Sequence, residues 1–143
     1  MGLVPQRVPA HGQRGRRLDA SGSGGVSHVR PWQVWLVDFG QPIGSEQRGV
    51  RPAVIVASEL HCRFPIDMTL VVPLTTRDRG LPHHVLINSS DGGLSRTSWA
   101  RTEDVTSIST ARLKGERPLG RLTESEAAEV GSWLQRMLAW PPT

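Results

Sequence analysis

Short apolar runs that alternate with turn residues fill most of the chain from Trp32 onward and restrict it to a mainly β fold. Two of these runs, "PAVIVAS" and "MTLVVPL", are continuously apolar, as buried central strands are. The spacing of the runs predicts a compact β-sandwich or barrel of short strands. The expected strands lie at residues 32–39, 52–58, 68–74, 83–87, 97–101, 104–108 and 117–122.

A helical pattern replaces the strand pattern after residue 122. Thr123 and Glu126 have the spacing of a capping box, which marks the start of a helix. Apolar residues then recur on one helical face, namely Ala127, Val130, Leu134 and Leu138. The sequence therefore predicts a mainly β fold with one C-terminal helix, and 143 residues suffice for a single domain.

The first 30 residues differ in composition from the rest of the chain. They are rich in Gly, Pro, Ser and Arg, show no apolar periodicity, and hold five arginines against one aspartate. We expect residues 1–30 to be a disordered basic extension and residues 31–143 to form the folded domain. The extension accounts for the whole net charge of +4, so a nucleic-acid site in the domain requires arginines clustered on one face.

Several classes of protein are disfavoured by what the sequence lacks. There is no run of about 18 apolar residues and no signal-peptide pattern, so we expect a cytoplasmic protein without a membrane segment. Cys62 is the only cysteine, which excludes an internal disulfide. His83 and His84 are adjacent and would point to opposite faces of a strand. We therefore expect neither a metal site nor a cofactor.

The loop "GSEQRGVRP" carries the first candidate site. Arg51 precedes Pro52, so its backbone is biased toward extended geometry where a glycine-containing loop meets a buried strand. A guanidinium held there can form a bidentate contact with a phosphate. Glu46 and Arg48 fit the same site or an ordinary polar loop equally well.

Two further constellations follow later in the chain. Thr75 and Thr76 end the strand "VVPL" and precede Arg77, and alternation allows only one of these threonines to face the same side as Arg51. Threonines at a strand end are commonly turn formers, and only a position on the same face as Arg51 makes them candidate site residues. In "TSWARTEDV", Arg101 and Glu103 would share one side of an extended segment, as an acid–base pair, a phosphate clamp or, most commonly, an interstrand salt bridge.

Taken together, these segments resemble the MazF/PemK family of toxin endoribonucleases from type II toxin–antitoxin systems. The family pattern is a tryptophan-bearing strand, a G-x-E-Q-x-G-x-R-P loop, an apolar strand and a strand ending in a hydroxyl residue. Here these are "VWLVDF", "GSEQRGVRP", "AVIVAS" and "VVPLTT". The later segments "SWARTEDVTSISTARL" and "LGRL" are also similar, and the match runs from Trp32 to about Leu138.

The resemblance implies an SH3-like small β-barrel, a homodimer, and a toxin neutralised by a cognate MazE-like antitoxin. It also implies metal-independent cleavage of single-stranded RNA, such as mRNA, at a short sequence, giving a 2′,3′-cyclic phosphate and a 5′-OH. By motif position, Arg51 and Thr75 match the family's catalytic arginine and hydroxyl. The residues expected to bind RNA are Glu46, Gln47, Arg48, Thr76, Arg77 and Arg101.

The identity of the general base is a separate question. A guanidinium keeps its proton at physiological pH, so Arg51 suits stabilisation of the phosphorane better than proton abstraction. Glu103 is the candidate base. In the PemK branch an Arg-x-Asp pair and a loop histidine have acid–base roles, and this chain has Arg101 and Glu103 at the pair but Ser45 at the histidine.

Two other functions remain open from the sequence. One is a gyrase-poisoning toxin of the same fold, which acts by binding through the end of its C-terminal helix, where Trp140 lies. The other is a catalytically silent nucleic-acid-binding module. Discrete RNA fragments formed in the presence of EDTA would separate the endoribonuclease from both.

Overall fold

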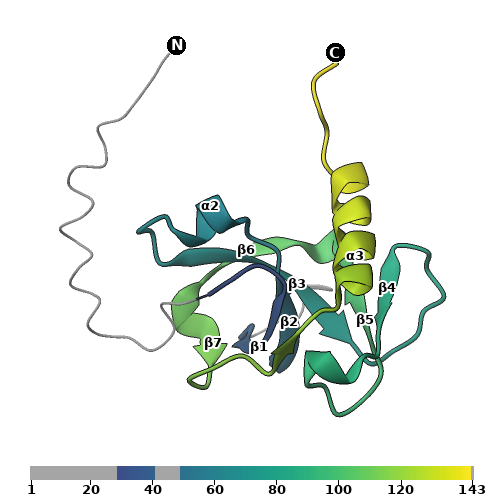
Figure 1. Cartoon of the computed structure of the whole chain (residues 1–143), viewed down its shortest axis with the longest axis horizontal. Coiled ribbons are helices and arrows are strands. Elements are labelled where there is room, and N and C mark those ends of the chain that lie inside the picture. The colour runs from purple at the N-terminus through teal and green to yellow at the C-terminus, as the bar shows by residue number, and fades with distance from the viewer. Residues whose placement is uncertain (1–28, 41–48, 143) are drawn as a thin grey trace.

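The structure, a computed structural model, describes residues 29–40 and 49–142 (Figure 1). Eight short strands precede one long helix in the described part of the chain, which confirms the predicted fold class. The strands are β1 (Gln33–Asp38), β2 (Val50–Ile55), β3 (Met68–Thr75), β4 (His84–Ile87), β5 (Ser98–Arg101), β6 (Thr106–Ser109), β7 (Leu113–Lys114) and β8 (Gly120–Arg121). The helices are α2 (Glu59–Cys62), α3 (Glu124–Met137) and the 3-10 turns η1 (Ser90–Gly92), η2 (Thr102–Asp104) and η3 (Thr110–Arg112).

All strand pairs are antiparallel, in the order β4-β5-β3-β2-β1-β7, with β6 also paired to β3 and β8 to β1. β3 is central to this arrangement. It pairs with β2 along one edge, while its other edge pairs first with β6 and then with β5. β3 thus connects the part of the sheet formed by β1, β2 and β6 with the part formed by β4 and β5, which lies beside α3 in Figure 1.

The two faces of β1, β2 and β3 contribute to two apolar cores. Because alternate residues point to opposite faces, Trp35, Ala53 and Val71 lie in one core while Val54 and Val72 lie in the other. The second core is closed by α3 and by β4 and β5, as Figure 1 shows. Both faces of the second half of β2 and of most of β3 are therefore buried, which explains the continuously apolar runs there.

Helix α3 begins with the predicted capping box. Thr123 Oγ1 accepts a bond from the Glu126 N–H, and Glu126 Oε1 accepts one from the Thr123 N–H. Val130 is fully buried, as expected, whereas Leu138 follows the last helical residue and is 54% exposed. The prediction for Leu138 was wrong because the helix ends before it, and Trp133 packs against the core instead.

Other boundaries also differ from the expectation. The strand expected at 104–108 begins only at Thr106, because Asp104 belongs to η2, and only Gly120 and Arg121 of the segment 117–122 are strand. Val29 is buried in the first core, so the last residues of the segment expected to be an extension belong to the packed domain. Residues 1–28 lie outside the described part of the chain. No helix among the described residues is long and apolar enough to cross a bilayer.

Candidate functional site

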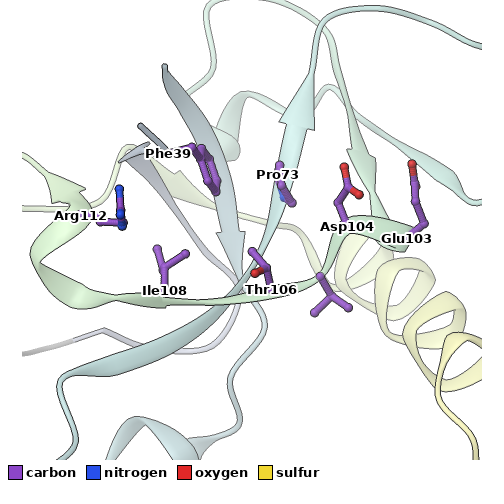
Figure 2. Close-up of a pocket in the computed structure, with 8 residues that line it drawn as sticks. Phe39, Pro73, Glu103, Asp104, Thr106, Ile108 and Arg112 are labelled. Carbon is purple, nitrogen blue, oxygen red and sulfur yellow. The ribbon is translucent and has the colours of Figure 1, made fainter. Parts of the chain in front are cut away.

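A cleft of about 380 Å³ opens on the side of the sheet that carries the first core (Figure 2). Its walls come from the end of β1, from β3, from η2 and from β6. Glu103 and Asp104 stand at one end of the cleft and Arg112 at the other, with Phe39 and Pro73 between them. Charged groups of both signs therefore flank an apolar middle.

Arg51 and Thr75 lie on the face of the sheet that bears this cleft. Ala53 of β2 pairs with Pro73 of β3, and alternate residues share a face, so Arg51 joins Ala53 and Thr75 joins Pro73. Continued by two residues, the same register sets Arg51 opposite Thr75. Both side chains are half-buried. The strand alternation thus places the arginine and the hydroxyl on the same face of two neighbouring strands, and neither residue is among those that line the cleft.

The threonine pair also serves the local backbone. Thr75 Oγ1 accepts a 3.1 Å hydrogen bond from the Arg77 N–H, which stabilises the turn that follows β3. Thr76 is exposed, as alternation requires for a neighbour of an inward-facing Thr75, and Arg77 is exposed as well. A hydroxyl that accepts the Arg77 N–H still has its own proton to donate.

Glu46, Gln47 and Arg48 lie outside the described residues. The described ends of their loop are fixed beside the cleft, because the Phe39 N–H bonds Gly49 O and the Gly49 N–H bonds Gly40 O, both at 2.9 Å. The loop containing these three residues therefore leaves and rejoins the sheet next to a lining residue of the cleft.

Ion pairs connect the predicted pair Arg101 and Glu103. Arg101 Nη2 lies 3.5 Å from Glu103 Oε2 and 2.9 Å from Asp104 Oδ2. The expected extended segment through Glu103 was wrong, because η2 turns the chain directly after β5, and the resulting ion pairs are local rather than between strands. Arg101 is thereby held against two carboxylates rather than presented as an open cation.

Two histidines complete this cluster, although the sequence motifs predict no role for them. His83 Nε2 and His84 Nε2 each lie 3.1 Å from Glu103 Oε1. The expectation that they point to opposite faces was wrong, because His83 belongs to the turn before β4 and strand alternation does not apply to it. Pro82, directly before them, is the sequence signal for that turn.

The environment of Glu103 sets its charge. Burial of the carboxyl acts to raise its pKa, but other effects outweigh it: hydrogen bonds from its own backbone N–H and from His84, and the charges of His84 and Arg101. The net result is a pKa below the ordinary value for a glutamate. Glu103 is therefore ionised at neutral pH and is a weaker proton acceptor than an isolated glutamate.

Comparison with known proteins agrees with this architecture. The sequence model of the PemK-like, MazF-like toxins of type II toxin–antitoxin systems matches residues 30–138. Endoribonuclease MazF9 of Mycobacterium tuberculosis is 32% identical over 112 residues, which cover 75% of this chain and 93% of that protein.

Two solved structures show the same fold. MazF from Deinococcus radiodurans has a TM-score of 0.65 at 21% identity, covering 76% of this chain and 94% of its own. A mycobacterial endoribonuclease in complex with its cognate antitoxin has a TM-score of 0.64 at 24% identity, covering 80% of this chain and 100% of its own. The match of the family model over most of the chain, supported by these likenesses, identifies the chain as a member of the PemK-like, MazF-like toxin family of type II toxin–antitoxin systems.

Proposed function

We propose that this chain is an endoribonuclease that cleaves single-stranded RNA at a short sequence without a metal ion. In the proposed reaction the ribose 2′-oxygen loses its proton and attacks the adjacent phosphorus. The bond from phosphorus to the 5′-oxygen then breaks, leaving a 2′,3′-cyclic phosphate and a 5′-OH. The observation that carries the proposal is the placement of Arg51 and Thr75 on the cleft face of the sheet in a chain of this family.

Arg51 is suited to the transition state. The phosphorane carries more charge than the ground state, and a guanidinium can contact two of its oxygens at once. Arg51 can also protonate the departing 5′-oxygen, since an alkoxide is a stronger base than a neutral guanidine. Thr75 supports the same charge by donating its hydroxyl proton to a phosphate oxygen.

Glu103 is the proposed acceptor of the 2′-OH proton. It lines the cleft and is ionised at neutral pH, which supports the role, while its lowered pKa limits its strength as a base. Arg101 contacts Glu103 and Asp104, which favours positioning of Glu103 over direct phosphate contact. We propose that Thr76 and Arg77, together with Glu46, Gln47 and Arg48 from the loop, bind the RNA on either side of the scissile bond.

The proposed partners are a MazE-like antitoxin and a second copy of the chain. One structural neighbour is an endoribonuclease bound to its cognate antitoxin, and we extend this kind of partner to the present chain. The apolar side chains Val50, Leu86 and Leu119 are each at least 41% exposed, and a dimer would give such surface a partner. Light scattering at micromolar concentration should give the mass of a dimer, and a monomer there would contradict this assignment.

RNA digestion in the presence of EDTA tests the activity. A long RNA incubated with the purified chain should give discrete fragments with cyclic phosphate ends. The two alternative functions predict intact RNA, and of these the gyrase-poisoning toxin has specific support in Trp140, which is 66% exposed beyond α3. Intact RNA would therefore reject the endoribonuclease, and a DNA supercoiling assay with gyrase would then distinguish the other two.

A further inference from the structure

Three metal-ligating side chains converge beside the cleft, at His83, His84 and Glu103. The candidate ligand atoms of the three residues all lie within 4.8 Å of one another. Both Nε2 atoms are 3.1 Å from the same carboxylate oxygen, and His84 Nε2 is also 3.2 Å from the second oxygen. Two imidazole nitrogens and one carboxylate thus lie close enough together to be ligands of a single ion.

The backbone holds this arrangement in place. His84 of β4 pairs with Arg101 of β5, which brings the turn before β4 next to η2. Thr102 Oγ1 donates a 2.7 Å hydrogen bond to the backbone oxygen of His83. The His83 ring meets the Trp133 ring edge-on with centroids 6.2 Å apart, so helix α3 supports it from the other side. The turn before β4, β4 itself and η2 thus hold the three candidate ligands through contacts that need no metal.

We propose that His83, His84 and Glu103 form a binding site for a divalent transition-metal ion of the Zn²⁺ class. Bonds of about 2.0–2.1 Å to a tetrahedral ion separate its donor atoms by roughly 3.3 Å, close to the 3.1 Å distances found here. Imidazole nitrogens favour Zn²⁺ and Co²⁺ over Mg²⁺ and Ca²⁺, which prefer oxygen. The side chains of His83 and Glu103 are 23% and 35% exposed, which leaves access for the ion and for a water as fourth ligand.

Two features limit the affinity of this site for a metal ion. His84 Nδ1 is buried without a hydrogen-bond partner among the described residues, whereas a histidine bound to metal ordinarily donates its second N–H to an acceptor. Lack of such a partner costs roughly ten- to a hundredfold in affinity. Arg101 Nη2, 3.5 Å from Glu103 Oε2, also competes with a cation for the carboxylate. We therefore expect Zn²⁺ to bind with micromolar rather than nanomolar affinity.

Binding would have a consequence for the cleft. An ion held by Glu103 occupies the carboxylate that the proposed reaction uses as a base, so Zn²⁺ should inhibit cleavage that EDTA leaves intact. This part of the inference rests on the proposed function. Metal binding itself does not depend on it, and a direct binding measurement separates the two.

The experiment titrates the full-length, tag-free chain with Zn²⁺ by calorimetry and with Co²⁺ by visible absorption. One Zn²⁺ per chain and the absorption bands of tetrahedral Co²⁺ are expected, with no heat from Mg²⁺. His83→Gln and Glu103→Gln should each weaken Zn²⁺ binding at least tenfold. Both side chains are partly exposed, so these variants should fold, which circular dichroism will verify, and His84→Gln is avoided because His84 is buried.

The remaining histidines of the chain, His11, His28 and His61, provide matched controls. Replacing any of them with Gln should leave the Zn²⁺ affinity unchanged. The proposal is overturned if the wild-type chain binds no Zn²⁺ at Zn²⁺ concentrations of about 100 micromolar. It is also overturned if the His83→Gln and Glu103→Gln variants bind Zn²⁺ as tightly as the wild type. Unchanged cleavage in a Zn²⁺-loaded chain would instead reject Glu103 as the base and leave the metal site standing.

Discussion

Arg51 and Arg48 are only three positions apart in the sequence, but we predict different roles for them. Arg51 belongs to β2 and faces the cleft side of the sheet, whereas Arg48 lies outside the described residues. Arg51→Ala should slow single-turnover cleavage at saturating RNA by about two orders of magnitude or more, because transition-state stabilisation is lost. Arg48→Ala should weaken RNA binding modestly and leave that rate near its original value.

Single-turnover rates and RNA affinities of the two variants check this difference. Thr75→Ala should resemble Arg51→Ala in a milder form, because one hydroxyl donor contributes less than a guanidinium. A folded Arg51→Ala chain that cleaves saturating RNA at near wild-type rate would show that this arginine has only a structural role.

Glu103 links stability to pH. Its pKa is lower in the folded chain than the ordinary value of 4.5, so its ionised form stabilises the fold at pH above that value. This contribution is lost as pH falls from about 4.5 through the lowered pKa, when the carboxyl facing His83, His84 and Arg101 becomes protonated. Wild type should therefore lose stability in that range more steeply than Glu103→Gln.

Urea unfolding of both chains between pH 7 and pH 3 measures this effect. The pH-dependent difference in unfolding free energy between wild type and Glu103→Gln should be modest, because a third of the Glu103 side chain is exposed and solvent screens its charge. Glu129→Gln, an exposed change on α3, serves as control and should follow the wild-type pH dependence. A constant gap between wild type and Glu103→Gln at all pH values would contradict the assignment.

At the scale of elements, Glu126 joins helix α3 to the end of β4. Besides closing the capping box, its Oε2 accepts 3.1 Å hydrogen bonds from the N–H groups of Asn88 and Ser89. Glu126→Ala should lower the free energy of unfolding by about 2–3 kcal/mol, because several backbone donors lose their partner. Thr123→Ala, which removes only the cap, should cost about 1 kcal/mol.

Chemical denaturation of the two variants, with Glu129→Ala as an exposed control on the same helix, compares these costs. The control should stay within about 0.5 kcal/mol of wild type. Equal losses for Glu126→Ala and Thr123→Ala would mean that the link to residues 88 and 89 adds nothing to stability.

At the scale of the whole molecule, Val29 and Arg30 pack with the domain, and we predict that the boundary of the folded domain falls close to Val29. Val29 is 8% exposed and packs in the first core, and the Arg30 N–H bonds Gln33 Oε1 at 2.9 Å. A chain lacking residues 1–28 should keep its melting temperature and its cleavage rate at fixed salt. A chain lacking residues 1–30 should be less stable by about 1.5 kcal/mol or more, since a buried valine is lost.

Thermal melting and RNA cleavage of the two truncated chains test this boundary. If removal of residues 1–28 alone reduced cleavage more than about tenfold, the basic segment would be part of the RNA site. If RNA binding by the chain lacking residues 1–28 depended less steeply on salt than binding by the full-length chain, the arginines of the removed segment would contact phosphates.

The sequence by itself determined the features that depend on neighbouring residues. Alternating apolar runs gave the strands, the spacing of Thr123 and Glu126 gave the start of α3, and the order of motifs gave the family. These signals are local because backbone hydrogen bonding and side-chain alternation act over a few residues. The position before Pro52 similarly sufficed to single out Arg51, although its role in cleavage is still a proposal.

Only the tertiary structure decided which distant residues meet. The pairing of β4 with β5 places His83 and His84 against Glu103, and the turn at η2 gives Arg101 two carboxylate partners. The burial of Val29 likewise depends on core residues far along the chain. Such contacts arise from the register between strands and from the packing of the cores, and no short sequence window contains both partners.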